Sequence, residues 1–386
     1  MIIYILILFI LAYPFIKKGC KATNSDNSIK WYFIILFLLS ALNYGLGFDT
    51  LGWDGNEGGY VEAYKNINPL GKLSPNDFMK ETWQPGFVIL FSCFKSISSN
   101  YLVYQIFHAF LINAIIFVFL RKTSYHVALC LFFYCILSYF DYNFEIQRES
   151  FCIVLGLLIY LLLDKNAGLR NTIIAIGLAI AAFLFLHRSA FILILYPLLK
   201  HIRLNGKVIW FTCIISILIQ YLWATFFNSL FMIINIISGD IYAGYISQDF
   251  LGGTNYKYFI FKVFTNVLIP YFCVYCSYKS GNNKYLVYVI ISILFERLSE
   301  YTYAFHRLYG YFAPFYWIVL TDTLVYIDKK YLHRSNILRF ITILLVTAYI
   351  MGTYHYVYFL YDDRTNGYVY EQYFPYRSVL ESGNSY

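Results

Sequence analysis

Apolar runs long enough to cross a bilayer alternate with short polar segments along the whole of this 386-residue chain. The runs are continuous and lack the apolar–polar alternation of membrane strands, so each is expected to form a helix. We place twelve of them at residues 1–16, 31–47, 101–120, 126–140, 147–163, 171–186, 189–199, 208–226, 257–278, 283–297, 306–327 and 338–360. The pattern predicts an all-α, polytopic membrane protein with about 12 transmembrane helices in one integral membrane domain, residues 1–386.

One apolar segment does not fit this series. Residues 86–97, GFVILFSCFKSI, are apolar but too few to cross the hydrocarbon core. We expect them to form an interfacial or re-entrant helix.

Composition and charge agree with a membrane protein and orient it. The chain is 60% hydrophobic and 13% charged, with a mean hydropathy of +0.58, whereas soluble domains carry about 25% charged residues. With both termini outside, 17 of the 29 Lys and Arg but only 4 of the 21 Asp and Glu lie on the inner side, as the positive-inside rule requires. The loops 48–85 and 227–256 and the tail 361–386 are then outside. A span at 86–97 would invert this pattern.

The same analysis explains two features that could be misread. The net charge of +8 reflects topology, so no nucleic-acid partner is expected. The first apolar run has no basic residue before it, which favours a first span over a cleaved leader.

The stretch FLFLHRSAFILILYPLLK holds His187 and Arg188 inside an apolar run. Two spans must share the 29 residues of 171–199, which leaves each about 21 Å of helix, less than the ~30 Å hydrocarbon core. A single long span would put Lys200 and Lys207 on the outer side, against the charge pattern. We therefore predict a hairpin turn at His187–Arg188, recessed in a cavity that opens to the outer side.

Further cations are expected at the same membrane face. Arg148 begins a predicted span beside Glu145 and Glu149, and FERLSEYTYAFHRLYGYF brings Arg297, His306 and Arg307 to the outer ends of two others. Cations at this depth often mark sites or pathways. Each could instead extend to lipid head groups or form a static ion pair with a nearby glutamate. For Arg297 the ion pair is the favoured interpretation, because Glu296 and Glu300 are close in sequence.

Several arginines at one membrane face suit a diphosphate, whose oxygens match the charge and fork geometry of guanidinium groups. This indicates a lipid diphosphate carrier as substrate. A base would have to accept a proton, and His187, Asp54, Glu57 and Glu149 are the candidates. We expect no metal and no cofactor, since the arginines can offset the charge and the chain has no D-x-D pattern.

Three segments give the chain a family resemblance. IQRESFCIVLGLLIYLL matches at Arg148, AAFLFLHRSAFILILYPLL at His187 with Arg188 in a basic position, and HRLYGYFAPFYWIVL at Arg307, Tyr311 and Phe312. In these positions and their order the sequence resembles the EpsG family of polysaccharide polymerases, relatives of the Wzy O-antigen polymerases. The first outer loop of such proteins tends to hold an acidic residue close before a tyrosine.

Here that loop holds the sequence GWDGNEGGYVEAY, with Asp54, Glu57 and Tyr60 at a spacing that departs from the family pattern.

The resemblance implies a GT-C-like glycosyltransferase in the bacterial inner membrane with its active site at the periplasmic or outer face. It would transfer a growing glycan from undecaprenyl diphosphate to a lipid-linked repeat unit. Arg148, His187, Arg188 and Arg307 would be catalytic. The substrate contacts would be made by Asp54, Glu57, Tyr60, Glu149, Arg297 and Tyr311. The expected partners are the lipid-linked oligosaccharide, membrane lipids, a chain-length regulator and a flippase.

Two other functions fit the same residues. One is an O-antigen ligase or another transferase that uses the same lipid donor. The other is a flippase or transporter for lipid-linked polysaccharide, which should have a charge-lined path reaching both sides of the membrane. Charges inside the predicted spans are few, which favours an enzyme with access from one side.

Overall fold

The computed structural model describes residues 2–21, 26–44, 50, 59–80, 83–166, 168–202, 204–219, 256–299, 303–332, 335–354, 361–362, 367–368 and 376–381. Asp54, Glu57 and nearly all of the 227–256 loop lie outside these residues. The chain forms two compact units, which are treated separately below. Unit 1 comprises residues 1–197 and 332–386, and unit 2 comprises residues 198–331.

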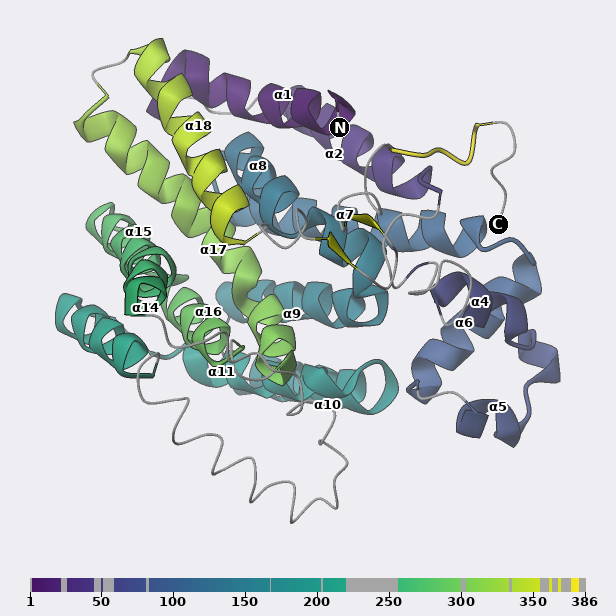
Figure 1. The fold of residues 1–386 in the computed structure, drawn as a ribbon. Coiled ribbons are helices and arrows are strands. Elements are labelled where there is room, and N and C mark those ends of the chain that lie inside the picture. Colours follow the sequence, from purple (N-terminus) through teal and green to yellow (C-terminus); the bar gives the residue numbers. More distant parts are fainter. Residues whose placement is uncertain are drawn as a thin grey trace. The chain divides into compact units, whose positions relative to one another are not determined.

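Unit 1 is built almost entirely from helices (Figure 1). Its α-helices are α1 (Ile2–Lys18), α2 (Asp26–Ala41), α4 (Tyr60–Asn66), α5 (Pro75–Lys80), α6 (Pro85–Ile97), α7 (Leu102–Thr123), α8 (Val127–Leu137), α9 (Gln147–Lys165), α10 (Leu169–Phe185), α11 (Leu195–Leu199), which ends across the unit boundary, and α18 (Asn336–Thr353). Short 3₁₀ and π segments are η1 (Gly19–Lys21), η2 (Leu70–Lys72), η3 (Asp141–Glu145) and η4 (Arg188–Ile194). Strands β1 (Tyr361–Asp362) and β2 (Gly367–Tyr368) form one antiparallel pair.

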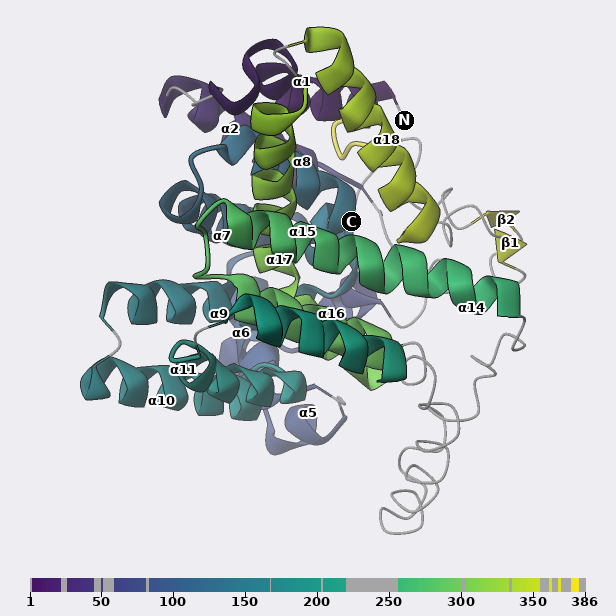
Figure 2. The same cartoon turned by 90° about the vertical axis from the view of Figure 1, so that its left-hand side faces the viewer.

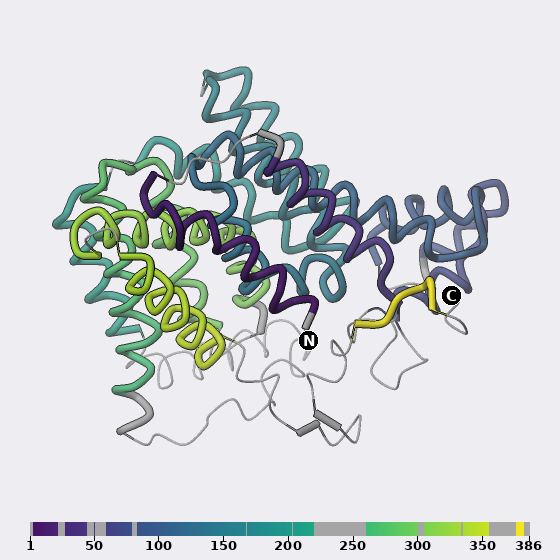
Figure 3. The backbone as a smooth tube through the Cα atoms, turned by 90° about the horizontal axis from the view of Figure 1, so that it is seen from above, coloured from purple at the N-terminus to yellow at the C-terminus, as the bar shows by residue number. Residues whose placement is uncertain are grey.

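Several helices of unit 1 pack against helices that are distant in sequence, and the C-terminal helix returns to the N-terminal one. Helix α2 packs on α7, α7 on α9, and α9 on α10, while α18 lies beside α1 (Figures 1 and 2). In Figure 3 the two purple helices α1 and α2 lie next to each other, and Ile7, Leu11, Tyr32 and Leu36 line the groove between them.

Unit 2 contains a helix at Gly206–Ile219, then α14 (Tyr256–Val263), η5 (Phe264–Leu268), α15 (Ile269–Lys279), α16 (Leu286–Ser299) and α17 (Tyr303–Lys330). Helices α16 and α17 pack through stacked rings, with the centroids of Tyr288 and Phe315 4.5 Å apart. Helix α15 is fixed to α17 by Thr323, whose hydroxyl donates to the carbonyl of Cys273 at 3.1 Å.

A described helix occupies each of the twelve predicted spans. Four helices are long and apolar enough to cross a membrane, namely Ile3–Lys21, Leu102–Thr123, Ile260–Lys279 and Asn336–Thr353, and shorter apolar helices account for several of the others. Large apolar side chains such as Trp210, Phe211 and Ile173 are exposed, as expected of a surface covered by lipid. The protein is a helical membrane protein, and the total of twelve spans remains a prediction.

Candidate functional site

Buried hydrogen bonds fix the first turn of α9, where Arg148 and Glu149 lie. The Tyr101 hydroxyl donates to Oε1 of Gln147 at 2.8 Å, and the Ser150 hydroxyl donates to the backbone carbonyl of Gln147 at 2.8 Å. Nε2 of His108 lies 3.0 Å from Ser150 Oγ. Because the single Ser150 hydrogen is used for Gln147, His108 is the donor in this contact. These contacts hold the start of α9 against α7.

Arg148 is partly exposed, and its guanidinium contacts an aromatic ring and not a carboxylate. Its guanidinium carbon lies 5.1 Å from the ring centroid of Trp83, within the range of a cation–π interaction. Its Nε is buried and has no hydrogen-bond partner among the described residues. Among the described residues, which include Glu145 and Glu149, Arg148 has no ion-pair partner, so the static ion pair that the sequence allowed is not formed. Arg297 does form an ion pair, as described below.

Aromatic residues from the first predicted outer loop and from α6 surround this guanidinium. Trp83 lies 5.7 Å from Tyr60 and 5.3 Å from Phe87, centroid to centroid. The backbone N–H of Arg148 donates to the Tyr60 hydroxyl at 3.5 Å, a long contact to one of the unpaired N–H groups of a helix start. The predicted contact residue Tyr60 therefore lies beside Arg148.

The predicted turn at His187 is confirmed. Helix α10 ends at Phe185, and η4 begins at Arg188. His187 has extended backbone angles and caps η4, since the Ser189 N–H donates to its Nδ1 at 3.3 Å. The backbone of α6 packs tightly against the end of α10 at Gly86. A Cβ on Gly86 would lie only 2.5 Å from the Phe185 carbonyl oxygen.

Ser189 joins His187 to Glu149. Its hydroxyl oxygen lies 2.6 Å from Nδ1 of His187 and 3.2 Å from Oε1 of Glu149. His187 is 7% exposed and Glu149 3% exposed. The structure therefore brings a buried histidine and a buried carboxylate together across one hydroxyl, and Arg148 adjoins Glu149 in the sequence.

The single hydrogen of Ser189 allows two arrangements. If it points to His187, Nδ1 is an acceptor and the imidazole proton is on Nε2. If it points to Glu149, Nδ1 carries the proton and donates to Ser189 Oγ, and Nε2 has a lone pair. This second arrangement gives up the hydrogen bond from the Ser189 N–H to Nδ1, which needs an unprotonated Nδ1. Only the second arrangement lets His187 accept a proton at Nε2 while a carboxylate stabilises the resulting imidazolium.

Arg188, the first residue of η4, is exposed. Contacts in unit 1 therefore bring together Tyr60, Arg148, Glu149 and His187 where α4, α9 and η4 begin, and Arg188 adjoins His187 in the sequence. That the turn is recessed within a cavity remains a prediction.

The other predicted residues belong to unit 2. Arg297 is 1% exposed and forms an ion pair with Glu296 at 3.1 Å, which confirms the expected pairing. Arg307 on α17 is partly exposed, and Tyr311, one turn later, is fully buried.

Burial shifts two titrating groups near the site. It raises the pKa of Asp141, in the connection between α8 and α9, to about 7, so this carboxyl titrates near neutral pH. It also raises the pKa of Tyr64 on α4 to about 12, which keeps that phenol protonated.

Two site residues, Trp83 and Ser189, were not predicted as such. Trp83 sits in a polar loop with no periodic signal, and a loop aromatic alone does not indicate a contact with Arg148. Ser189 directly follows His187 and Arg188, and no pattern in the sequence distinguishes it. The sequence contains no sign that Glu149, 40 residues earlier, lies within hydrogen-bond distance of it.

Comparison with known proteins gives one match. The model of the EpsG family matches residues 30–378, which include every residue of this site. No curated protein and no solved structure matches the chain.

Proposed function

The chain belongs to the EpsG family of polysaccharide polymerases, and from this premise we propose its reaction. It transfers a growing glycan from undecaprenyl diphosphate to a lipid-linked repeat unit. The reaction takes place at the outer face of the bacterial inner membrane.

The observation that carries this proposal is Arg148. It is a guanidinium at the start of a 19-residue helix and lies beside Trp83. Among the described residues it forms no ion pair, and its buried Nε has no hydrogen-bond partner. A helix start and a cation both favour an anion. A diphosphate provides the oxygens that this arrangement lacks.

In the proposed step a sugar hydroxyl of the acceptor attacks C1 of the donor sugar. The C1–O bond to the diphosphate breaks, and its electron pair leaves with the phosphate oxygen. Arg148 and Arg188 offset the charge that grows there. The family resemblance assigns the same role to Arg307, which belongs to unit 2.

His187 accepts the proton of the attacking hydroxyl at Nε2. Ser189 and Glu149 are positioning residues that keep its Nδ1 protonated and stabilise the imidazolium. Asp54 and Glu57 remain alternative bases, and Tyr60, Arg297 and Tyr311 remain predicted substrate contacts.

Deletion of the gene, followed by separation of surface glycan on a ladder gel, tests this function. We expect loss of long polymer with single repeat units retained, and restoration by the intact gene. Loss of all surface glycan would instead indicate a ligase or a flippase and would overturn the proposal.

A further inference from the structure

A basic pocket lies between α1 and α18 in unit 1, which we call the α1–α18 pocket. It has a volume of about 340 Å³ and is lined by Lys17, Lys18, Cys20, Lys21, Asn336 and Arg339. Four of these six residues are cations, and none is an acid. The three lysines are exposed, whereas Arg339 is 4% exposed.

This pocket and the candidate site are at opposite ends of unit 1. Helix α2 begins just after the pocket lysines and is about 24 Å long. Its far end is held by Gln105, whose amide donates to the carbonyls of Ala41 and Asn43 at 3.0 and 2.9 Å. One turn earlier on α7, Tyr101 contacts Gln147 beside Arg148. The pocket therefore lies on the side where the charge pattern predicts the cytosol.

Positive charge is concentrated in the α1–α18 pocket. Helix α18 begins here, with no acidic residue in its first turn, so its positive dipole end adds to the four cations. Arg339 is buried at this end, and its Nη1 donates to Oδ1 of Asn336 at 3.2 Å. Lys17 and Lys18 lie in the last turn of α1, and the Lys17 amino group lies 5.8 Å from the centroid of the Tyr13 ring. The lining residues include no acid, so a bound anion would meet positive charge from both helices.

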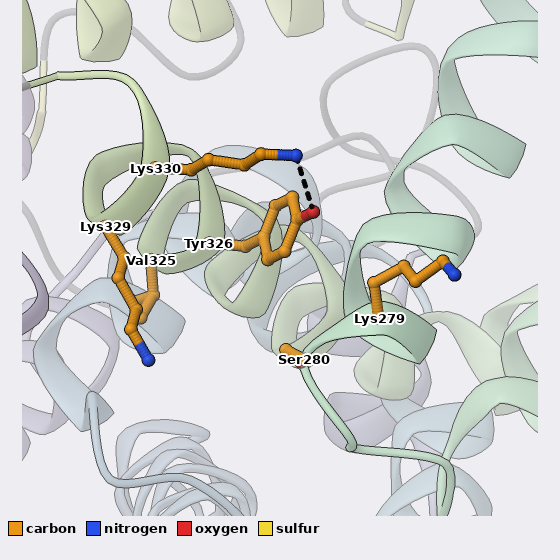
Figure 4. A pocket seen from close by; sticks show the side chains of 6 residues that line it. All are labelled: Lys279, Ser280, Val325, Tyr326, Lys329 and Lys330. Atoms are coloured by element: carbon orange, nitrogen blue, oxygen red, sulfur yellow. Dashed lines mark hydrogen bonds between the residues drawn. The ribbon is translucent and has the colours of Figure 1, made fainter.

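A basic pocket in unit 2 provides a comparison. It has a volume of about 510 Å³ and is lined by Lys279, Ser280, Val325, Tyr326, Lys329 and Lys330. Its lysines end α15 and α17, where the negative dipole ends of the helices favour cations. Figure 4 shows their amino groups pointing in different directions, with that of Lys330 bonded to the Tyr326 hydroxyl. No helix begins among its lining residues, so this pocket lacks the positive dipole end that α18 adds to the α1–α18 pocket.

We propose that the α1–α18 pocket binds a phosphate-bearing anion, the head group of an anionic phospholipid. Lipid is favoured over a soluble phosphate because exposed apolar side chains flank the pocket along both helices. Tyr13 on α1 is 46% exposed, and Ile337 and Ile341 on α18 are 71% and 43% exposed. The acyl chains would lie along these residues while the phosphate contacts the cations.

The test is native mass spectrometry of the full-length protein released from nanodiscs that contain equal amounts of phosphatidylglycerol and phosphatidylcholine. The test variant is Lys17→Gln/Lys18→Gln/Lys21→Gln. The matched control, Lys279→Gln/Lys329→Gln/Lys330→Gln, removes the same charge from the other pocket. We expect the intact protein and the control to retain phosphatidylglycerol preferentially, and the test variant to lose about fivefold in retention for each lysine replaced.

Each other outcome is decisive. Absence of a phosphatidylglycerol preference in the intact protein overturns the lipid proposal whatever the variants do. An equal loss in the control variant also overturns it, because general surface charge would then explain the binding. A second measurement adds inorganic phosphate to delipidated protein and follows thermal unfolding. Phosphate could stabilise the intact protein but not the lysine variant, while no lipid preference is seen. The pocket would then bind a soluble phosphate and not a lipid head group.

Discussion

Ser189 has one hydroxyl hydrogen and two neighbours, His187 and Glu149, to which it can point. The role of His187 depends on this choice and can be tested. If His187 is the base, activity falls as pH drops through the imidazole pKa, near ~6.5 when unperturbed. The change Glu149→Gln keeps the hydrogen bond but removes the charge that favours the imidazolium. It should lower the pKa of His187 and move the acidic limb of the rate profile to lower pH.

Asp141→Asn is the control for that profile, because the raised pKa of Asp141 could produce a similar limb. The limb should persist in this variant. The base role would be refuted if Glu149→Gln left the acidic limb at the same pH and His187→Gln kept full activity. His187 would then serve only to cap η4.

Trp83 holds the guanidinium of Arg148, and its loss should weaken catalysis without unfolding the protein. Cation–π contacts are worth about 0.5–2 kcal/mol, so Trp83→Ala should lower the rate of polymer formation roughly 2- to 30-fold. Trp83→Phe should recover part of it. Trp210→Ala, which removes a tryptophan 60% exposed in unit 2, should have little effect. Equal losses at the two positions would refute a specific role for Trp83.

Variants of Arg297 and Glu296 test whether Arg297 contributes to stability or to substrate binding. Breaking a buried ion pair by removing one partner costs about 3–5 kcal/mol, so Arg297→Ala should lower the thermal unfolding temperature in detergent. The double variant Arg297→Ala/Glu296→Gln should regain part of this loss. A stable Arg297→Ala protein with a raised KM would instead make Arg297 a substrate contact.

At the scale of elements, the meeting of α6 and α10 positions the His187 turn. A methyl group at Gly86 would overlap the Phe185 backbone, and such overpacking costs about 1–3 kcal/mol. Gly86→Ala should lower both thermal stability and polymer yield. Gly177→Ala on α10 is the control, since no atom lies within 4 Å of its added methyl, and alanine is the better helix former by about 1 kcal/mol. Unchanged polymer in Gly86→Ala would show that this contact does not position the turn.

The elements themselves were largely predictable from the sequence, because the apolar runs coincide with described helices. The turn at His187 followed from length and charge together, since 29 residues are too few for two full spans and the charge pattern excludes one long span. The Arg297–Glu296 pair followed from adjacency. In contrast, the contacts of Arg148 with Trp83 and of Glu149 with Ser189 depend on tertiary packing, which leaves no periodic signal in the sequence.

At the scale of the whole molecule, the chain is a helical membrane protein of the EpsG family. Within unit 1 the candidate site and the α1–α18 pocket lie at opposite ends, as the predicted outer and inner faces require. Residues Asp54 and Glu57 lie outside the described part of the chain, so their proposed role depends on the family resemblance.

The central claim is that Arg148 stabilises the departing lipid diphosphate. The most direct measurement is the single-turnover rate of glycan transfer in proteoliposomes supplied with undecaprenyl-diphosphate-linked repeat units. Arg148→Ala should lower this rate about 10²- to 10³-fold. Arg148→Lys should recover only part of it, because lysine keeps the charge but loses the fork. Arg170→Ala, at an exposed arginine where α10 begins, should transfer glycan at the normal rate. A folded Arg148→Ala protein with a rate within about twofold of the intact enzyme, a change below ~0.5 kcal/mol, would contradict the account.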